Sequence, residues 1–570
     1  MDDNINSFSL DAREVGAAPI VRRIFERLDL DRLLETYVPG RRFGRKADVS
    51  HGRALSVMVA NAVLSRQPLY AVPEWLDRHI VQNFGLRDDE TKFFNDDRIG
   101  RALDRLYEAD RASLMTAVVT KAIREFKIDL AQIHNDTTTV TFSGAYEGQK
   151  LKAEKKRPPL ITFGYNKDHR PDLKQLVYSL TISRDGAVPV HYKTFDGNTT
   201  DDQTHIDTWS LIRELAGRPD FTYVADSKLC TRENMAFIAG HGGRFVTVLP
   251  RSRGEDDDFR DHIQKNVVLW DEVRREKNPR GKDKPDHVYW AFEPGMRSVE
   301  GYRIVWYRSS VKTELDQKRR TKKIARARER LQELENRTGA HRFRSKDAAE
   351  KAVQKVLQEE GAERWLTVEV VEETVGDVKQ IGPGRPGKDT TYRRVELPVI
   401  FIEVADNPET IQADARCDGL FAMVSNVENL TPEGLLGVYK YQPFLEKRNE
   451  QLKSVLSVAP MFLKKPERVA ALLFVYFLAV LVFALIEREV RNRMAEEDIT
   501  ELPLYPEERL CEAPTADVVI QAVEGLRCSR LVDANGEVVK VFHDELTPVA
   551  KKVLRLLGVD LRAYGVNRKA

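Results

Sequence analysis

LAQIHNDTTTVTF, from Leu130 to Phe142, is the stretch of this sequence that decides its fold. Its many β-branched residues predict a buried β-strand. Asp136 is the one acid inside it. An ionised carboxylate is costly to bury, so it normally has a charged partner or a metal ion. The stretch therefore predicts a strand that carries a candidate functional carboxylate.

The sequence that follows predicts a mixed α/β domain with the element order β-β-β-α-β-α-β. The segments are 130–142, 173–182, 188–195, 203–217, 221–226, 231–240 and 244–250. The second and third strands alternate apolar and polar residues on either side of an Arg184-Asp185-Gly186 turn, which predicts a hairpin. Asp226 closes the fourth strand. For Asp136 and Asp226 the alternative interpretation is an aspartate at a strand end that caps a neighbouring turn.

Bulk properties exclude several classes of protein. With 570 residues, the chain is long enough for three or four domains, and 42% apolar residues suffice for real cores. The net charge is only +2, so affinity for an acidic polymer must come from local patches. The four cysteines are far apart and form no CxxC pair, which argues against a zinc site or a disulfide framework and fits a reducing cytosol. The polar, acidic N-terminus is not a secretory signal.

One segment has two interpretations. Val469 to Ile486 is a run of 18 apolar residues, which is the lower limit for a membrane span. The alternative is the central helix of a large globular domain, because such a helix is also apolar all round. Charged sequences flank the run and the rest of the chain is polar, so we favour the buried helix and expect no membrane association.

Changes in pattern divide the chain into five regions. The first, 1–128, is helical, with Ser50 as a predicted N-cap and a basic loop at Arg41–Lys46 that is either solvated or in contact with phosphate. The other regions are 129–250, 251–420, 421–495 and 496–570. Region 251–420 contains Lys312–Arg330, which has nine basic and three acidic residues. Such a run is most often a solvated helix, but it is the strongest single candidate for following a phosphate backbone.

A second informative stretch is VYKYQPFLEKRNEQLK, Val438 to Lys453. Tyr439, Glu446 and Lys453 are each seven residues apart, and Gln442 precedes Glu446 by four. On one helix these four residues would share a stripe. We therefore expect a helix that presents a carboxylate framed by a phenol, an amide and an ammonium group.

These motifs resemble the DDE transposases of bacterial insertion sequences, in the branch with the signature Y-x2-R-x3-E-x6-K. Tyr439, Gln442, Glu446 and Lys453 occupy its four positions, with Gln442 where the family has arginine. The stretches 135–144, 163–176 and 224–229 are similar to the text around the family's two aspartates. The stretches 16–39 and 95–110 are similar to its helical leader. The resemblance thus covers nearly the whole chain.

The resemblance implies a ribonuclease-H-like mixed sheet as catalytic core, interrupted by a large α+β insertion at 251–420. An all-α N-terminal domain (1–128) and a small C-terminal region (496–570) complete it. The first and fourth strands would lie side by side, and Asp136, Asp226 and Glu446 would form a metal triad. Three carboxylates that converge repel one another by about 1 to 4 kcal/mol per pair near 4 Å. Two Mg²⁺ ions, or Mn²⁺ in their place, would relieve that repulsion.

The implied function is to cut the ends of an insertion sequence and to join the freed 3′-hydroxyls to target DNA by two-metal phosphoryl transfer. Tyr439 and Lys453 would hold phosphates, and Lys440 or Lys447 would compensate for the uncharged Gln442. The partners would be terminal inverted repeats and target DNA, bound by a homodimer or a larger synaptic assembly in a bacterial cytoplasm, at the nucleoid. The N-terminal helices and the basic run are candidates for terminal-repeat recognition.

Three alternatives remain open. A decayed or repurposed transposase would bind DNA without catalysis, and Gln442 is the feature in its favour. A structure-selective nuclease of the same fold would cut DNA without joining ends. A single-span membrane protein would use the apolar run. A DNA-hairpin intermediate, with Trp270, Trp290 or Trp306 stacking on a flipped base, is also left open.

Overall fold

The chain forms two compact units in a computed structural model. Unit 1 comprises Met1–Thr247 and Gly437–Ala570, and unit 2 comprises Val248–Leu436. The five regions expected from the sequence stay a prediction. The basic loop Arg41–Lys46 lies outside the described residues. These are 8–40, 48–142, 146, 157–165, 170–199, 204–278, 281, 283–336, 343, 345–388, 390–458, 463 and 465–566.

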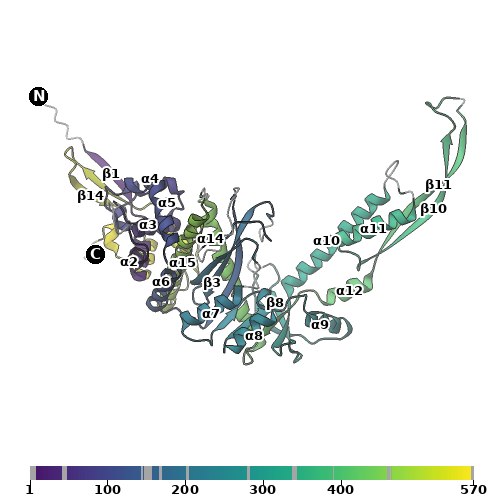
Figure 1. The fold of residues 1–570 in the computed structure, drawn as a ribbon, viewed down its shortest axis with the longest axis horizontal. Coiled ribbons are helices and arrows are strands. Elements are labelled where there is room, and N and C mark those ends of the chain that lie inside the picture. The colour runs from purple at the N-terminus through teal and green to yellow at the C-terminus, as the bar shows by residue number, and fades with distance from the viewer. Residues whose placement is uncertain are drawn as a thin grey trace. The chain divides into compact units, whose positions relative to one another are not determined.

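A mixed sheet forms the centre of unit 1 (Figure 1). Its strands follow the order β4-β3-β2-β5-β6. β2 pairs antiparallel with β3 and parallel with β5, so the predicted adjacency of the first and fourth strands is confirmed. The predicted hairpin is also confirmed, because β3 and β4 pair antiparallel. The strands are β2 (Gln132–Phe142), β3 (Lys174–Ser183), β4 (Pro189–Phe195), β5 (Thr222–Val224) and β6 (Arg244–Val248).

The helices that link the parallel strands follow from their sequences. α7 (His205–Ala216) precedes β5 and ends at Gly217, which adopts the left-handed conformation that glycine tolerates. α8 (Arg232–Gly240) lies between β5 and β6, and the Thr231 hydroxyl caps it by accepting a hydrogen bond from the Asn234 amide. Both helices were predicted, over the segments 203–217 and 231–240.

The N-terminal part of unit 1 is mainly helical, as expected, and Ser50 caps α3 through the Arg53 amide. One expectation was wrong: the region is not all-α. β1 (Ser9–Glu14) pairs with β13 (Arg527–Val532), which also pairs with β14 (Val538–His543). A short polar strand whose partner lies some 500 residues away has no local signature. The helices are α1 (Ala18–Leu28), α2 (Leu30–Tyr37), α3 (His51–Leu64), α4 (Val72–Asp77), α5 (Asp96–Glu108) and α6 (Arg111–Phe126).

The long apolar run forms the central helix of unit 1. α15 (Pro466–Glu496) is long and apolar enough to cross a membrane, but its 18-residue apolar window is entirely buried inside the structure. It packs against α3, α5, α14 and β4. The buried-helix interpretation therefore accounts for the apolar sequence. Two short helices, α16 (Ala516–Gln521) and α17 (Pro548–Leu556), also contact α15.

Unit 2 contains a second group of antiparallel strands and a helical layer. The strands follow the order β12-β9-β8-β7. The basic run lies on α10, as predicted. The elements are α9 (Gly254–Lys265), β7 (Asp271–Glu276), β8 (His287–Phe292), β9 (Arg303–Ser309), α10 (Ser310–Glu335), α11 (Lys346–Glu360), β10 (Leu366–Gln380), β11 (Tyr392–Asp406), α12 (Pro408–Arg416), β12 (Leu420–Ser425) and α13 (Pro432–Tyr439), which continues into unit 1.

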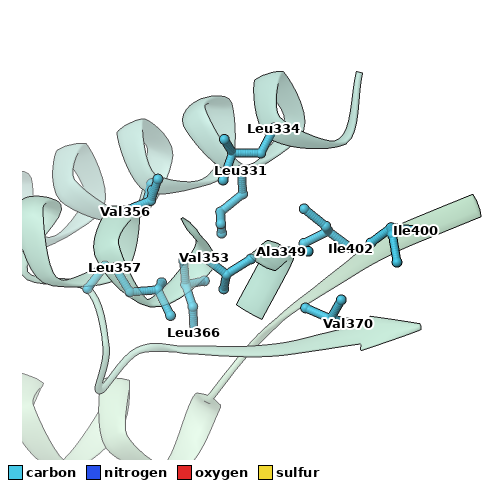
Figure 2. Packing of buried hydrophobic residues seen from close by; sticks show 12 residues of the cluster. Leu331, Leu334, Ala349, Val353, Val356, Leu357, Leu366, Val370, Ile400 and Ile402 are labelled. Atoms are coloured by element: carbon cyan, nitrogen blue, oxygen red, sulfur yellow. The ribbon is translucent and has the colours of Figure 1, made fainter. Parts of the chain in front are cut away.

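A separate apolar core joins α10, α11, β10 and β11 (Figure 2). Leu331 and Val353 face the strand residues Val370 and Ile402 across it. The sequence did not predict β10, because its charged sequence LTVEVVEETVGDVKQ has little apolar alternation beyond its first residues. Unit 2 thus has a hydrophobic core of its own.

Candidate active site

The parallel pairing of β2 and β5 places Asp136 and Asp226 at the same level along neighbouring strands. His134 pairs with Val224 in this register, and Asp136 and Asp226 each follow two residues later. Asp136 is half-buried, and its Oδ1 accepts a hydrogen bond from the Thr137 amide at 2.7 Å. Asp226 is also half-buried, and its Oδ1 caps the next turn by accepting from the Lys228 amide at 2.9 Å. The turn-capping alternative therefore holds for Asp226, without excluding a second role for its other oxygen.

Glu446 lies exposed on α14 (Gln442–Val458). The expectation of one helix from Val438 to Lys453 was wrong, because α13 ends at Tyr439 and α14 begins at Gln442. Pro443 supplies the physical reason: in a continuous helix its ring would clash with the Tyr439 carbonyl, and it has no N–H to donate. At the second position of a new helix a proline is tolerated.

The negative charges of the three predicted carboxylates all act on the Tyr439 phenol. Burial raises the pKa of Tyr439 well above its usual value, and the negative charges of Asp226, Asp136 and Glu446 raise it further. These acids come from a strand, a turn and a helix that are far apart in the sequence. A tyrosine phenol is protonated at neutral pH in any case, and the raised pKa strengthens this preference, so Tyr439 is available as a hydrogen-bond donor.

Gln442 does not share the exposed face of Glu446. Its side chain is buried, its Oε1 lies 3.0 Å from His134 Nδ1, and its Nε2 donates to the Asn135 carbonyl at 3.4 Å. The expectation that Gln442 shares a stripe with Glu446 is therefore wrong, and a contact of this amide with phosphate stays a prediction. His134 is completely buried and needs a polar partner, which the first residue of α14 supplies.

This contact belongs to a buried polar chain that the sequence analysis missed. Gln132 Nε2 lies 2.7 Å from His134 Nε2 and 3.1 Å from the Val438 carbonyl, and Arg184 Nη1 donates to Gln132 Oε1 at 3.3 Å. The signal was present, because Gln132, His134 and Asp136 alternate along β2 and so share one face. These hydrogen bonds connect β2, the strand of Asp136, to both ends of the turn between α13 and α14.

The three predicted lysines occupy different environments. Lys440 lies in the turn between α13 and α14 and is half-buried, as is Lys453 near the end of α14. Lys447 is exposed on the same helix as Glu446. Their contact with DNA stays a prediction.

The carboxylates do not form a closed metal cage by themselves. Within the ranges given above, no three His, Cys, Asp or Glu side chains are grouped so that they could hold a metal ion. The donor chemistry suits Mg²⁺, since carboxylate oxygens are its preferred protein ligands, and Mg²⁺ needs only one or two of them. The triad as a set of metal ligands stays a prediction.

Comparisons with known proteins add little to this site. A family model described as a domain of unknown function, DUF4277, matches residues 10–120. The comparison with curated proteins found no match. Among solved structures, the chain is similar to one described as the cryo-EM structure of a piggyBac transposase synaptic complex with hairpin DNA. The identity is 10%, the match covers 83% of this chain and 74% of that one, and the TM-score is 0.35. At that TM-score the likeness carries no argument, so the site itself must carry the assignment of function.

Proposed function

We propose that this chain is a DDE transposase that cuts the ends of an insertion sequence and joins the freed 3′-hydroxyls to target DNA. One observation carries the proposal: the parallel register of β2 and β5 places Asp136 and Asp226 at the same level of neighbouring strands, and their charges act with that of Glu446 on the half-buried Tyr439 phenol. Three carboxylates from a strand, a turn and a helix thus act on one phenol, and ionisable groups that interact in this way are typical of functional sites. The sequence motifs around these residues support the same function.

The proposed architecture is a ribonuclease-H-like core. The strand order β4-β3-β2-β5-β6, with β2 parallel to β5, supports it. Unit 2, Val248–Leu436, would be the large insertion that separates the second aspartate from the glutamate. Both ends of an element must be cut together, so the active form would be a homodimer or a larger synapse. It would act on DNA in a bacterial cytoplasm.

Asp136, Asp226 and Glu446 would hold two Mg²⁺ ions. When bound, such ions activate the attacking hydroxyl and stabilise the leaving oxygen of an in-line displacement. The protein's own groups orient the DNA strand. The Tyr439 hydroxyl would donate a hydrogen bond to a phosphate oxygen. Lys453 and Lys447 would supply positive charge beside that phosphate.

The alternative of a decayed, non-catalytic transposase loses its only supporting feature. It rested on Gln442 as an uncharged replacement in a phosphate contact. In this structure the Gln442 amide is buried against His134 and Asn135, so its lack of charge does not weaken a grip on DNA.

A Glu446→Gln substitution tests the proposal. We expect Mg²⁺-dependent cleavage of terminal-repeat DNA to fall at least about 10³-fold, a loss of roughly 4 kcal/mol in transition-state stabilisation. Binding to the same DNA should be unchanged, because the amide keeps the shape of the side chain. Cleavage is measured on end-labelled duplex, and binding by mobility shift.

Glu450→Gln is the matched control, since Glu450 is exposed on the same helix one turn further on. It should cleave like the wild type. If Glu446→Gln also cleaved normally, the triad would be wrongly assigned. A wild-type protein that cuts but never joins 3′-hydroxyl ends to a second duplex would be a nuclease instead.

A further inference from the structure

The most exposed feature of unit 2 is a two-stranded arm made by β10 and β11. The strands are 15 residues each and pair antiparallel along their whole length, which corresponds to an arm of about 50 Å. Its inner part packs on α10 and α11 through Leu366, Val370, Ile400 and Ile402. Figure 1 shows that the outer part continues past both helices.

The outer part of the arm has no protein partner among the described residues. From Glu372 to Lys379 every side chain of β10 is exposed, and so are Tyr392, Arg393 and Arg394 on β11. A two-stranded ribbon with no covered face is at best marginally stable in water. Apolar side chains nevertheless remain in the open, and Val378, Ile381 and Tyr392 are at least half exposed.

Positive charge collects at the end of this arm, Val378–Val395, which we call the arm tip. The tip carries five basic side chains and one acidic one. All five basic side chains are exposed, and none forms an ion pair within the described parts of the chain. The five residues are Lys379, Arg385, Lys388, Arg393 and Arg394. The inner arm is acidic, with Glu369, Glu372, Glu373 and Glu403. The charge is thus separated along the arm.

The pairing register places two of these cations directly opposite each other. Lys379 pairs with Arg393 across the ribbon, while Arg394 pairs with Val378 and points to the other face. Like charges at opposite positions of a β-ribbon destabilise it. An anion bound between Lys379 and Arg393 would relieve that repulsion, and both faces of the ribbon offer cations.

The cations of the basic helix α10 differ from those of the arm tip in their partners. Many of its cations are already committed to carboxylates, as in the pairs Lys318–Glu314, Arg320–Asp418 and Arg328–Asp406. An ion pair must be broken before such a side chain can neutralise a phosphate. The arm-tip cations have no ion-pair partner among the residues that the structure describes, which favours the tip over α10 as the surface for a polyanion.

We propose that the arm tip is a docking surface for the phosphate backbone of duplex DNA. This inference rests on the proposed function, since it names a second DNA contact of the same enzyme. A two-stranded β-ribbon has the width to enter the major groove, where its edges face both phosphate rows. Gly382 and Gly384, with φ of 103° and 130°, allow the narrow turn that such an entry needs. The exposed Tyr392 and Ile381 would contact sugars and base edges.

The test replaces the five tip cations in the full-length protein with glutamine and measures the affinity for duplex DNA of mixed sequence over a range of salt concentrations. The slope of log K against log salt is negative, and each phosphate contact that is lost makes it less steep by about 0.9. We therefore expect the slope to become less steep by about 3 to 4.5 and the affinity at about 0.1 M salt to fall by about 10³-fold or more. Because the tip is exposed, the circular dichroism spectrum should not change.

A control variant removes the same charge from α10 and α11 through Lys318→Gln, Lys322→Gln, Arg326→Gln, Lys351→Gln and Lys355→Gln, all at exposed positions. It should keep the wild-type slope. An unchanged slope in the tip variant, or an equal loss in the control, would overturn the proposal. So would a tip variant that changes only the oligomeric state in sedimentation, since the tip would then contact protein.

The two proposals can fail separately. A wild-type protein that binds duplex DNA through the tip but cuts none would refute the transposase assignment and leave the docking surface standing. A wild-type protein that cuts terminal-repeat DNA while the tip variant keeps the wild-type salt slope would do the reverse.

Discussion

At the scale of single residues, the most constrained side chain near the site is His134. The Gln132 amide nitrogen can only donate, so His134 Nε2 must accept from it, and Nδ1–H then donates to Gln442 Oε1. This pattern requires the neutral imidazole. Burial lowers the pKa of His134 from 6.5 to about 4, and the positive charge of Arg184 acts in the same direction. A second proton would also replace the Gln132 hydrogen bond with a clash of donors.

The buried His134 predicts that the protein loses stability in mild acid. The pKa is about 4 in the folded state and near 6.5 in the unfolded state, so between these values the unfolded chain binds more protons. This single group should lower the free energy of unfolding by about 2 kcal/mol between pH 7 and pH 5. Urea unfolding at the two pH values measures it. His134→Gln should flatten the pH dependence by that amount.

His241→Gln is the comparison variant, since His241 is exposed in the same unit. Its pH dependence should match that of the wild type. An unaltered dependence in His134→Gln would mean that His134 takes up its second proton in the folded state, contrary to the hydrogen-bond pattern.

At the scale of elements, one buried ion pair fixes the helix that carries Glu446. Arg448 on α14 pairs with Glu487 on α15 at 2.8 Å, and both side chains are almost completely buried. Arg448 Nε and Nη2 also donate to the carbonyls of Ala187 and Gly186 in the turn between β3 and β4. Burial alone raises the pKa of Glu487, but the charge and hydrogen bond of Arg448 hold it below its usual value.

Removal of one member of this pair should be strongly destabilising. Arg448→Met leaves the Glu487 carboxylate buried without its main partner, and we expect a loss of about 3 to 5 kcal/mol in the free energy of unfolding. The double variant Arg448→Met/Glu487→Met should recover much of that loss, since no unpaired charge remains. Urea unfolding of the single and double variants measures both effects.

The exposed pair Arg493–Glu496 on α15 is the control. Both of its side chains are more than half exposed, so Arg493→Met should cost less than about 1 kcal/mol. If Arg448→Met were as mild, or if the double variant were no better than the single one, the pair would not be what holds α14 on α15.

At the scale of the whole molecule, the apolar helix α15 decides between a membrane protein and a globular one. Its whole apolar window is buried by other elements of unit 1. We expect the protein to remain in the supernatant when membranes are washed with alkaline carbonate, which strips everything except integral proteins. Retention in the pellet would show that the helix leaves its packed position for a bilayer. A known single-span protein in the same preparation is the control.

The sequence by itself determined the local elements and the choice of candidate site residues. The β-branched residues of β2, the alternation in β3 and β4 and the cap at Ser50 are short-range signals, and each element formed where the sequence placed it. Asp136, Asp226, Glu446 and Tyr439 could be singled out because a lone acid in a strand, or a regular polar spacing, is visible within a few residues.

Only the tertiary structure decided which of these residues meet. It turned Gln442 into the core and brought three distant carboxylates within electrostatic reach of Tyr439. It also paired β1 with β13, and β10 with β11 to form the arm. The reason is physical: capping and alternation act between near neighbours in the chain. Burial, strand pairing and the field at a phenol are sums over atoms that only the folded chain brings together.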